Sequence, residues 1–265
     1  MPSPSQYAAM PRFLSRLLLR SQLSDEERRA ILDLPAKSRQ VGPNHDIIQP
    51  GGHTDEATLV AHGMVARYDA MKDGERQITA FYIPGDMCDL HSVVSPTAGW
   101  GLMGLVGSII LSVPHAALKK LAVTHPAIAI AFWRDTTVDG SILSKWVGNV
   151  GRRTAKARIA HVICEMGIRS EGAELGTRDC FPLNVTQFQL ADAVGLTAVH
   201  VNRTLQELRR DNIISTVART VTVPDWQRLA EVAEFDPTYL LLPGNEPHWR
   251  SGSPGTLARL SPMHG

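Results

Sequence analysis

The run TAVHVNR at residues 197–203 gathers a threonine, a histidine, an asparagine and an arginine directly after a glycine corner at Gly195. Side chains of these types donate hydrogen bonds to phosphate oxygens and to the edges of bases. They are also ordinary residues of a solvated helix face. Whether the run is a solvated face or a recognition surface depends on the secondary structure predicted around it.

The residues on both sides of Gly195 predict two short helices joined by a tight corner. Thr186 is placed to cap a helix that begins at Gln187, and Thr197 to cap a second helix that begins at Ala198. Leu190, Ala191 and Val194 form the inward face of the first helix. The inward face of the second helix follows the i, i+3, i+4, i+7 spacing of a buried stripe, with Val201, Thr204, Leu205 and Leu208.

This spacing is typical of a helix-turn-helix, which sets the N-terminal residues of its second helix against base edges in the major groove. Gly195 suits a corner with positive φ. The β-like segment IISTVARTVTV that follows predicts a wing carrying Arg219. A plain helical hairpin is the alternative, but the two caps, the glycine corner and the wing together favour the helix-turn-helix.

The first half of the chain has a different texture. Residues 1–10 are small and polar and are expected to be loose, whereas residues 12–34 are helical, with a second helix start at Ser24, which Glu27 completes as a capping box. From 35 to 114, short β-forming runs alternate with glycine, proline, asparagine and aspartate. Asp73-Gly74 between two alternating runs predicts a hairpin. We expect a compact β-roll or barrel here.

A longer helix is predicted from Pro126, a favoured first position, to about residue 147. Its apolar residues repeat at 128, 131, 138 and 142, with Asp135 inside the same seam. This stripe fits either a core helix or a dimerisation helix. A hinge-like break is expected at 148–153, helices near 154–168 and after Asp225, and a loose tail from Pro243.

The sequence resembles the Crp/Fnr transcription regulators over about residues 12–225. The most specific stretch is TQFQLADAVGLTAVHVNRTLQELRRDNII, and LVAHGMV and IPGDM match less specifically. The resemblance implies an α+β chain with four parts: a cyclic-nucleotide-binding-like jelly-roll at 12–125, a dimerisation helix and hinge at 126–150, a winged helix-turn-helix at 151–235, and a tail at 236–265. It further implies a homodimer on a palindromic DNA operator, with RNA polymerase as a partner if the protein activates.

The resemblance assigns functional positions of the family to individual residues of this sequence. Arg203 matches the family's recognition arginine, whose fork suits guanine O6 and N7. Thr186, Gln187, Thr197 and Arg219 match positions that cap or contact phosphate. Ala198, Val199, His200 and Asn202 complete the outward set. Many relatives have a glutamate where Val199 stands, so a valine–thymine methyl contact is expected instead, and the operator of the best-known relatives is not assumed.

The input signal is left open by the sequence. The stretch GDMCDLHSVVSPTAGWGLMGLV lacks the glutamate and arginine with which relatives hold cyclic AMP, so weak or no binding is expected. His91 falls where a haem-sensing relative has its histidine ligand, but that relative's cysteine lies one position after Cys88. A haem or thiol sensor using Cys88 and His91, or Cys180, is an alternative to a small-molecule effector. Cys88 and His91 are equally explained as residues packed within the roll.

Composition sets the remaining limits. The chain is 43% hydrophobic and 20% charged with a net charge of +1, which is ordinary for a globular protein. Three cysteines without a CxxC pair argue against disulfides and a structural zinc. A cytoplasmic protein with no membrane span is expected. The histidines His45, His53, His62 and His91 show no metal-binding spacing for a cupin-like enzyme, so no catalytic residues are predicted. The other alternative is a regulatory module that binds a ligand and does not bind DNA.

Overall fold

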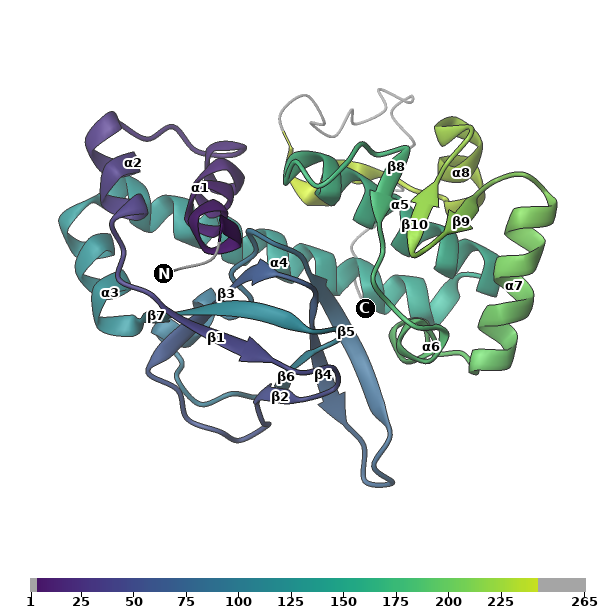
Figure 1. Ribbon diagram of the computed structural model, residues 1–265, viewed down its shortest axis with the longest axis horizontal. Helices are drawn as coiled ribbons and strands as arrows, with labels where there is room; N and C mark the ends of the chain where they lie inside the picture. The colour runs from purple at the N-terminus through teal and green to yellow at the C-terminus, as the bar shows by residue number, and fades with distance from the viewer. Residues whose placement is uncertain (1–3, 243–265) are drawn as a thin grey trace, which may run out of the picture.

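The computed structural model describes residues 4–242, and it has the predicted α+β architecture (Figure 1). Two N-terminal helices precede a β-roll, a long helix packs along the roll, and a mixed helical and stranded unit follows. The N-terminal half contains α1 (Pro4–Leu18), α2 (Asp25–Leu32), β1 (Lys37–Val41), β2 (Asp46–Ile48), β3 (Glu56–His62), β4 (Val65–Ala70), β5 (Arg76–Tyr82), η1 (Leu90–Val93), β6 (Gly101–Gly104) and β7 (Ser108–Pro114). The remainder contains α3 (His115–Thr124), α4 (Pro126–Arg152), α5 (Ala155–Gly172), β8 (Cys180–Pro182), α6 (Gln187–Val194), α7 (Ala198–Arg210), β9 (Ser215–Val217), β10 (Thr220–Thr222), α8 (Trp226–Ala233) and η2 (Pro237–Leu240).

The N-terminal helix begins earlier than the sequence predicts. Residues 4–10 belong to α1, so the expectation that residues 1–10 are loose is wrong for them, while residues 1–3 lie outside the described part. The reason is packing: Ala9 and Met10 are buried and extend the apolar stripe of Phe13 and Leu17 against β3. The capping box of Ser24 and Glu27 at α2 is confirmed.

The roll consists of two antiparallel sheets, one in the order β1-β7-β3 and one in the order β2-β6-β4-β5. The predicted hairpin at Asp73-Gly74 joins β4 to β5, and Gly74 has φ +88°. Gly63 carries the chain from one sheet to the other with φ +85°, and a Cβ there would lie 2.4 Å from the Ser108 hydroxyl. Only glycine fits this crossing.

Helix α4 is the longest element; it settles one point that the sequence left open and corrects another. The seam at 128–142 is buried within this same chain, so it is the core face of the helix. Asp135 is tolerated in that seam because Arg16 Nε donates to its carboxylate at 2.7 Å. The predicted break at 148–153 is wrong for most of its length, because the helix continues through Gly148 and Gly151 to Arg152 and Thr154 then caps α5.

The C-terminal half packs α6, α7 and α8 around α5, beside a small sheet in the order β8-β10-β9. Asp225 caps α8 as predicted. The chain then returns to α4 and α5 through η2, where Tyr239 and Leu240 are buried. The loose tail predicted from Pro243 lies outside the described residues.

One hydrophobic core joins the roll to the C-terminal half. Phe81 of the roll meets Trp146 of α4 edge-on with ring centroids 5.3 Å apart, and both belong to a cluster that continues into α5, α6 and α7. A second cluster lies beneath α1. Within residues 4–242, no helix combines the length and apolarity that crossing a membrane requires.

Candidate nucleic-acid interface

Helices α6 and α7 meet at the predicted corner. Thr186 Oγ1 accepts from the Gln189 N–H at 3.1 Å and Thr197 Oγ1 from the His200 N–H at 3.2 Å, so both predicted caps are confirmed. Gly195 has φ +62° at the corner, and a Cβ there would lie 3.0 Å from Val150 on α4. The corner is therefore held by local hydrogen bonds and by contact with the long helix.

The two faces of α7 divide as predicted. The inward residues Val201, Thr204, Leu205 and Leu208 are buried. On the outside, Val199 is 82% exposed, and Asn202 and Arg203 are also exposed; we call these three residues the reading face. Ala198 and His200 are only half-buried, and Ala198 packs against the core. The structure thus turns Ala198 further inward than the sequence suggests.

A wing stands beside this face. Strands β9 and β10 form a hairpin whose two turn residues, Ala218 and Arg219, have φ of 47° and 67°, as a two-residue turn of the primed type requires. Arg219 is exposed at its tip. A groove of about 250 Å³ lies between the wing and α6, and its rim includes Thr186, Gln187, Arg209 and Arg219.

The electrostatics of this surface favour an anion. Neither α6 nor α7 has an acidic residue in its first turn, so the positive ends of both helix dipoles are uncompensated by side chains. The cap hydroxyls of Thr186 and Thr197 accept bonds from the backbone, which leaves their own protons free to be donated. Helix N-termini, hydroxyls and arginines are the groups that bind phosphate.

The three sensor candidates lie in different surroundings. Cys88 is buried in the roll beside Val60 and Tyr82, and burial raises the pKa of its thiol well above the ordinary value. His91 packs on Trp100 with ring centroids 4.9 Å apart, and burial lowers its pKa. Cys180 is exposed on β8. Within residues 4–242, no three His, Cys, Asp or Glu side chains are arranged to hold a metal ion.

The roll interior contains a charged residue that sequence analysis did not single out. Arg67 is buried, donates from Nη1 to Asp139 of α4 at 2.6 Å and from Nε to Thr79, and lies over the Trp100 ring. Its Nη2 atom has no partner among the described residues. The Tyr82 hydroxyl also donates to Asp139, at 3.0 Å. The guanidinium charge inside the roll is therefore matched by a carboxylate of the chain itself.

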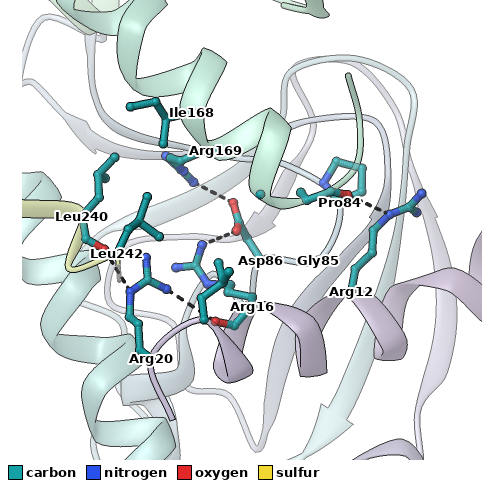
Figure 2. A pocket seen from close by; sticks show the side chains of 13 residues that line it. Arg12, Arg16, Arg20, Pro84, Gly85, Asp86, Ile168, Arg169, Leu240 and Leu242 are labelled. Atoms are coloured by element: carbon teal, nitrogen blue, oxygen red, sulfur yellow. Dashed lines mark hydrogen bonds and ion pairs between the residues drawn. The ribbon is translucent and has the colours of Figure 1, made fainter. Parts of the chain in front are cut away.

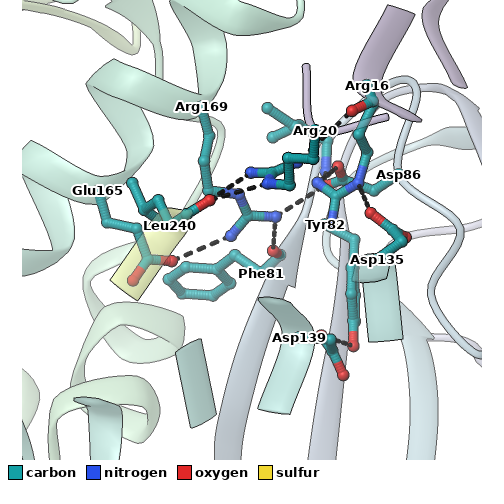
Figure 3. Close-up of polar contacts among 11 residues, drawn as sticks. Arg16, Arg20, Phe81, Tyr82, Asp86, Asp135, Asp139, Glu165, Arg169 and Leu240 are labelled. Carbon is teal, nitrogen blue, oxygen red and sulfur yellow. Dashed lines mark hydrogen bonds and ion pairs between the residues drawn. The ribbon is translucent and has the colours of Figure 1, made fainter. Parts of the chain in front are cut away.

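A second set of charged residues lies where α1, the roll, α4 and α5 meet, and only Asp135 of this set had been singled out in the sequence. We call it the junction cluster, and it consists of Arg16, Asp86, Asp135, Glu165 and Arg169 (Figure 3). Asp86, from the turn IPGDM, binds both Arg16 and Arg169. Burial opposes its ionisation, but the two arginines outweigh this and hold its pKa below the ordinary value.

A small cavity of about 40 Å³ borders the junction cluster (Figure 2). Arg12 donates across it to the Ala173 carbonyl at 3.2 Å, and Arg20 to the Leu240 carbonyl at 2.9 Å. Burial, together with the neighbouring Arg16, lowers the pKa of Arg20 to about 10. The arginines here bind groups of the chain itself and tie α1 to the C-terminal half.

Comparison with known proteins agrees with this architecture. The family model of the Crp-like helix-turn-helix domain matches residues 157–232. The regulatory protein HlyX of Actinobacillus pleuropneumoniae is 22% identical over 210 residues, 79% of this chain and 87% of that protein. The transcriptional activator protein FnrL of Cereibacter sphaeroides is 24% identical over 216 residues, 80% of this chain and 86% of that protein.

Solved structures give the same result. FixK2 from Bradyrhizobium japonicum is 26% identical with a TM-score of 0.68, covering 75% of this chain and 98% of that chain. A CooA mutant from Carboxydothermus hydrogenoformans, 16% identical with a TM-score of 0.60 over 83% of this chain and 95% of that chain, shares the fold.

A β-roll, a long helix and a winged helix-turn-helix in this order define a DNA-binding transcription regulator. Residues 157–232 match the Crp-like helix-turn-helix domain, and over most of its length the chain is similar to HlyX, FnrL and FixK2, as a regulator of the Crp/Fnr type would be. Transcription regulation through DNA binding is its function.

Proposed function

We propose that this regulator reads a two-fold related operator as a homodimer, with the reading face of α7 in the major groove. The observation that carries the proposal is the division of α7, whose inward stripe is buried while Val199, Asn202 and Arg203 remain exposed beside two capped helix N-termini. Arg203 offers a bidentate fork to guanine, and Val199 an apolar contact to a thymine methyl. Thr186, Gln187, Thr197 and Arg219 contact phosphates and fix the register.

The outer face of α4 supplies the dimer contact. Ile130, Trp133 and Val147 are 44%, 71% and 68% exposed. With the small residues Thr137, Gly140 and Ser144 they form one stripe with alternating spacings of three and four, the period of two helices packed along their length. An exposed tryptophan in such a stripe supports pairing with a second copy. We call these six residues the outer stripe.

The roll receives the signal in this proposal, and its ligand is not a cyclic nucleotide held in the manner of the cyclic-AMP-binding relatives. The charge of Arg67 is already matched by Asp139, and the stretch after Gly85 supplies no other arginine up to Val106. In this proposal the protein is a regulator and not an enzyme. Its proposed location is the cytoplasm. RNA polymerase is a partner only if the regulator activates.

Selection of bound duplexes from a randomised DNA library tests the proposal. Enrichment of an inverted repeat with half-site centres about one helical turn, 10–10.5 base pairs, apart is the expected result. A folded dimer that enriches no inverted repeat would contradict it. The oligomeric state is measured on the same preparation, so that failure to dimerise and failure to read are told apart.

A further inference from the structure

Helix α6 lies directly against the roll, and a glutamine side chain holds each of its ends. Gln189 on α6 donates from Nε2 to the Leu105 carbonyl and to Asn44 Oδ1, both at 3.0 Å. Gln77 on β5 donates from Nε2 to the Asp192 carbonyl at 2.6 Å. The first turn and the last turn of this eight-residue helix are therefore each bonded to a different part of the roll.

Gln189 also belongs to the site that faces DNA. Its side-chain Oε1 atom accepts from the Thr186 backbone N–H at 2.9 Å, and the Gln189 backbone N–H donates to the Thr186 hydroxyl, which completes a capping box. One amide group thus connects Thr186, a proposed phosphate contact, with two atoms of the roll. Gln189 is only 6% exposed, and a buried amide is costly wherever a hydrogen bond is lost.

The surrounding packing makes this contact an ordered one. Ile78 and Leu105 of the roll belong to the same buried cluster as Leu190 and Ala193 of α6. Apolar contacts and hydrogen bonds act at the same place here. The roll and α6 therefore keep one relative orientation as long as both kinds of contact are intact. The roll and α6 are in direct contact, so this connection does not depend on the segment 148–152, which is continuous helix.

We propose that Gln189 and Gln77 form a joint through which the roll itself sets the orientation of the helix-turn-helix. Gln189 is a positioning residue in this joint, since it acts on the DNA through Thr186. The effect on operator choice rests on the proposed function, but the joint itself does not. In a dimer, fixing α6 on each roll fixes the separation of the two reading faces, so the joint makes the protein selective for one half-site spacing.

The substitution Gln189→Glu tests the joint because it separates the two roles of the side chain. Glutamate is as good as glutamine in a capping box, so the Thr186 bond is kept. The lost NH₂ group leaves a carboxylate facing two acceptors, Leu105 O and Asn44 Oδ1. Gln40→Glu, an equal change at an exposed position of β1, is the matched control.

Hydrogen exchange in the DNA-free protein is the first readout. Faster exchange confined to α6 and to the facing strand β5 is expected in Gln189→Glu and absent in Gln40→Glu. The second readout is the affinity lost when one base pair is inserted between the half-sites of the selected operator. This loss should shrink by at least about fivefold in Gln189→Glu, the lower end of typical coupling between sites.

Wild-type exchange in α6 together with a wild-type spacing penalty would overturn the joint. If Gln189→Glu does not fold, Gln77→Ala decides the question by the same two readouts, because Gln77 has no part in the cap. If wild-type protein binds no duplex selectively, the proposed function fails, while the exchange measurement still confirms or rejects the joint.

Discussion

Val199 is the apolar residue of the reading face. Its apolar side chain is 82% exposed at the start of α7, on the same face as Asn202 and Arg203. A thymine methyl group is the apolar feature of the major groove. Under the proposed function, contact with that methyl group gives a preference for thymine at one position in each half-site.

This preference is testable with a modified base. Replacing that thymine by deoxyuridine removes only the methyl group, which should cost wild-type protein about 0.8 kcal/mol per half-site. Val199→Ala should bind the two duplexes equally, because it lacks the contact. Equal sensitivity to deoxyuridine in both proteins, measured by fluorescence anisotropy, would place Val199 away from the base edges.

His161 is a buried residue whose lowered pKa predicts a loss of stability in acid. It packs against Tyr239 and Phe235, and burial, aided by Arg153 and Lys145, lowers its pKa to about 3. The unfolded chain binds a proton near pH 6.5 that the folded chain rejects. The stability contributed by His161 is therefore present above pH 6.5 and is lost as the pH falls toward 3.

Between pH 7 and pH 5 this loss should amount to about 2 kcal/mol of unfolding free energy. Urea denaturation at the two pH values measures it. His161→Phe should remove that part of the pH dependence, and the exposed control His62→Gln should leave it. An identical pH dependence in wild type and His161→Phe would show that His161 is not the group responsible.

At the scale of elements, the junction cluster explains how four segments distant in sequence are held together. Asp86 supplies the carboxylate shared by Arg16 of α1 and Arg169 of α5. Asp86→Asn would leave two buried guanidinium groups short of a counter-charge, so a loss of about 3–5 kcal/mol in unfolding free energy is expected.

Glu171→Gln gives the matched comparison for this prediction. Glu171 pairs with Arg178 at 2.7 Å, but both side chains are more than a third exposed. The loss there should be at most about 1 kcal/mol. Losses of similar size for the two variants in denaturant titrations would contradict a structural role for the junction cluster.

The parts of the site that could be predicted from the sequence are those with local determinants. The caps at Thr186 and Thr197 and the corner at Gly195 depend on residues within four positions of one another, so their pattern is legible in the chain. The contacts that orient these elements are not local. Gln77 and Asp192 are 115 residues apart, and Arg16 and Asp135 are 119 apart, and no local pattern relates such pairs.

Helix α4 shows a second limit of sequence reasoning. It carries two apolar stripes, one at 128–142 and one containing Trp133, and either could serve the core. Only packing against the roll decides that the first is buried and the second exposed. The sequence could therefore indicate a long amphipathic helix without assigning its faces.

At the scale of the whole molecule, the outer stripe predicts the oligomeric state. Trp133→Glu would place a charge in the centre of the helix pair, so the variant should sediment as a monomer where wild type is a dimer. The control Lys120→Glu, at an exposed position of α3, should remain dimeric. A dimeric Trp133→Glu protein in analytical ultracentrifugation would move the interface away from α4.

If the reading face of α7 selects the DNA sequence, substitution of Arg203 must change the preferred site. Wild-type protein and Arg203→Ala should be compared by selection from one randomised duplex library followed by sequencing. The variant should lose preference at one symmetric pair of base pairs, bind the wild-type site about 1–3 kcal/mol more weakly, and keep its preferences elsewhere. The same sequence preferences in both proteins would contradict the account.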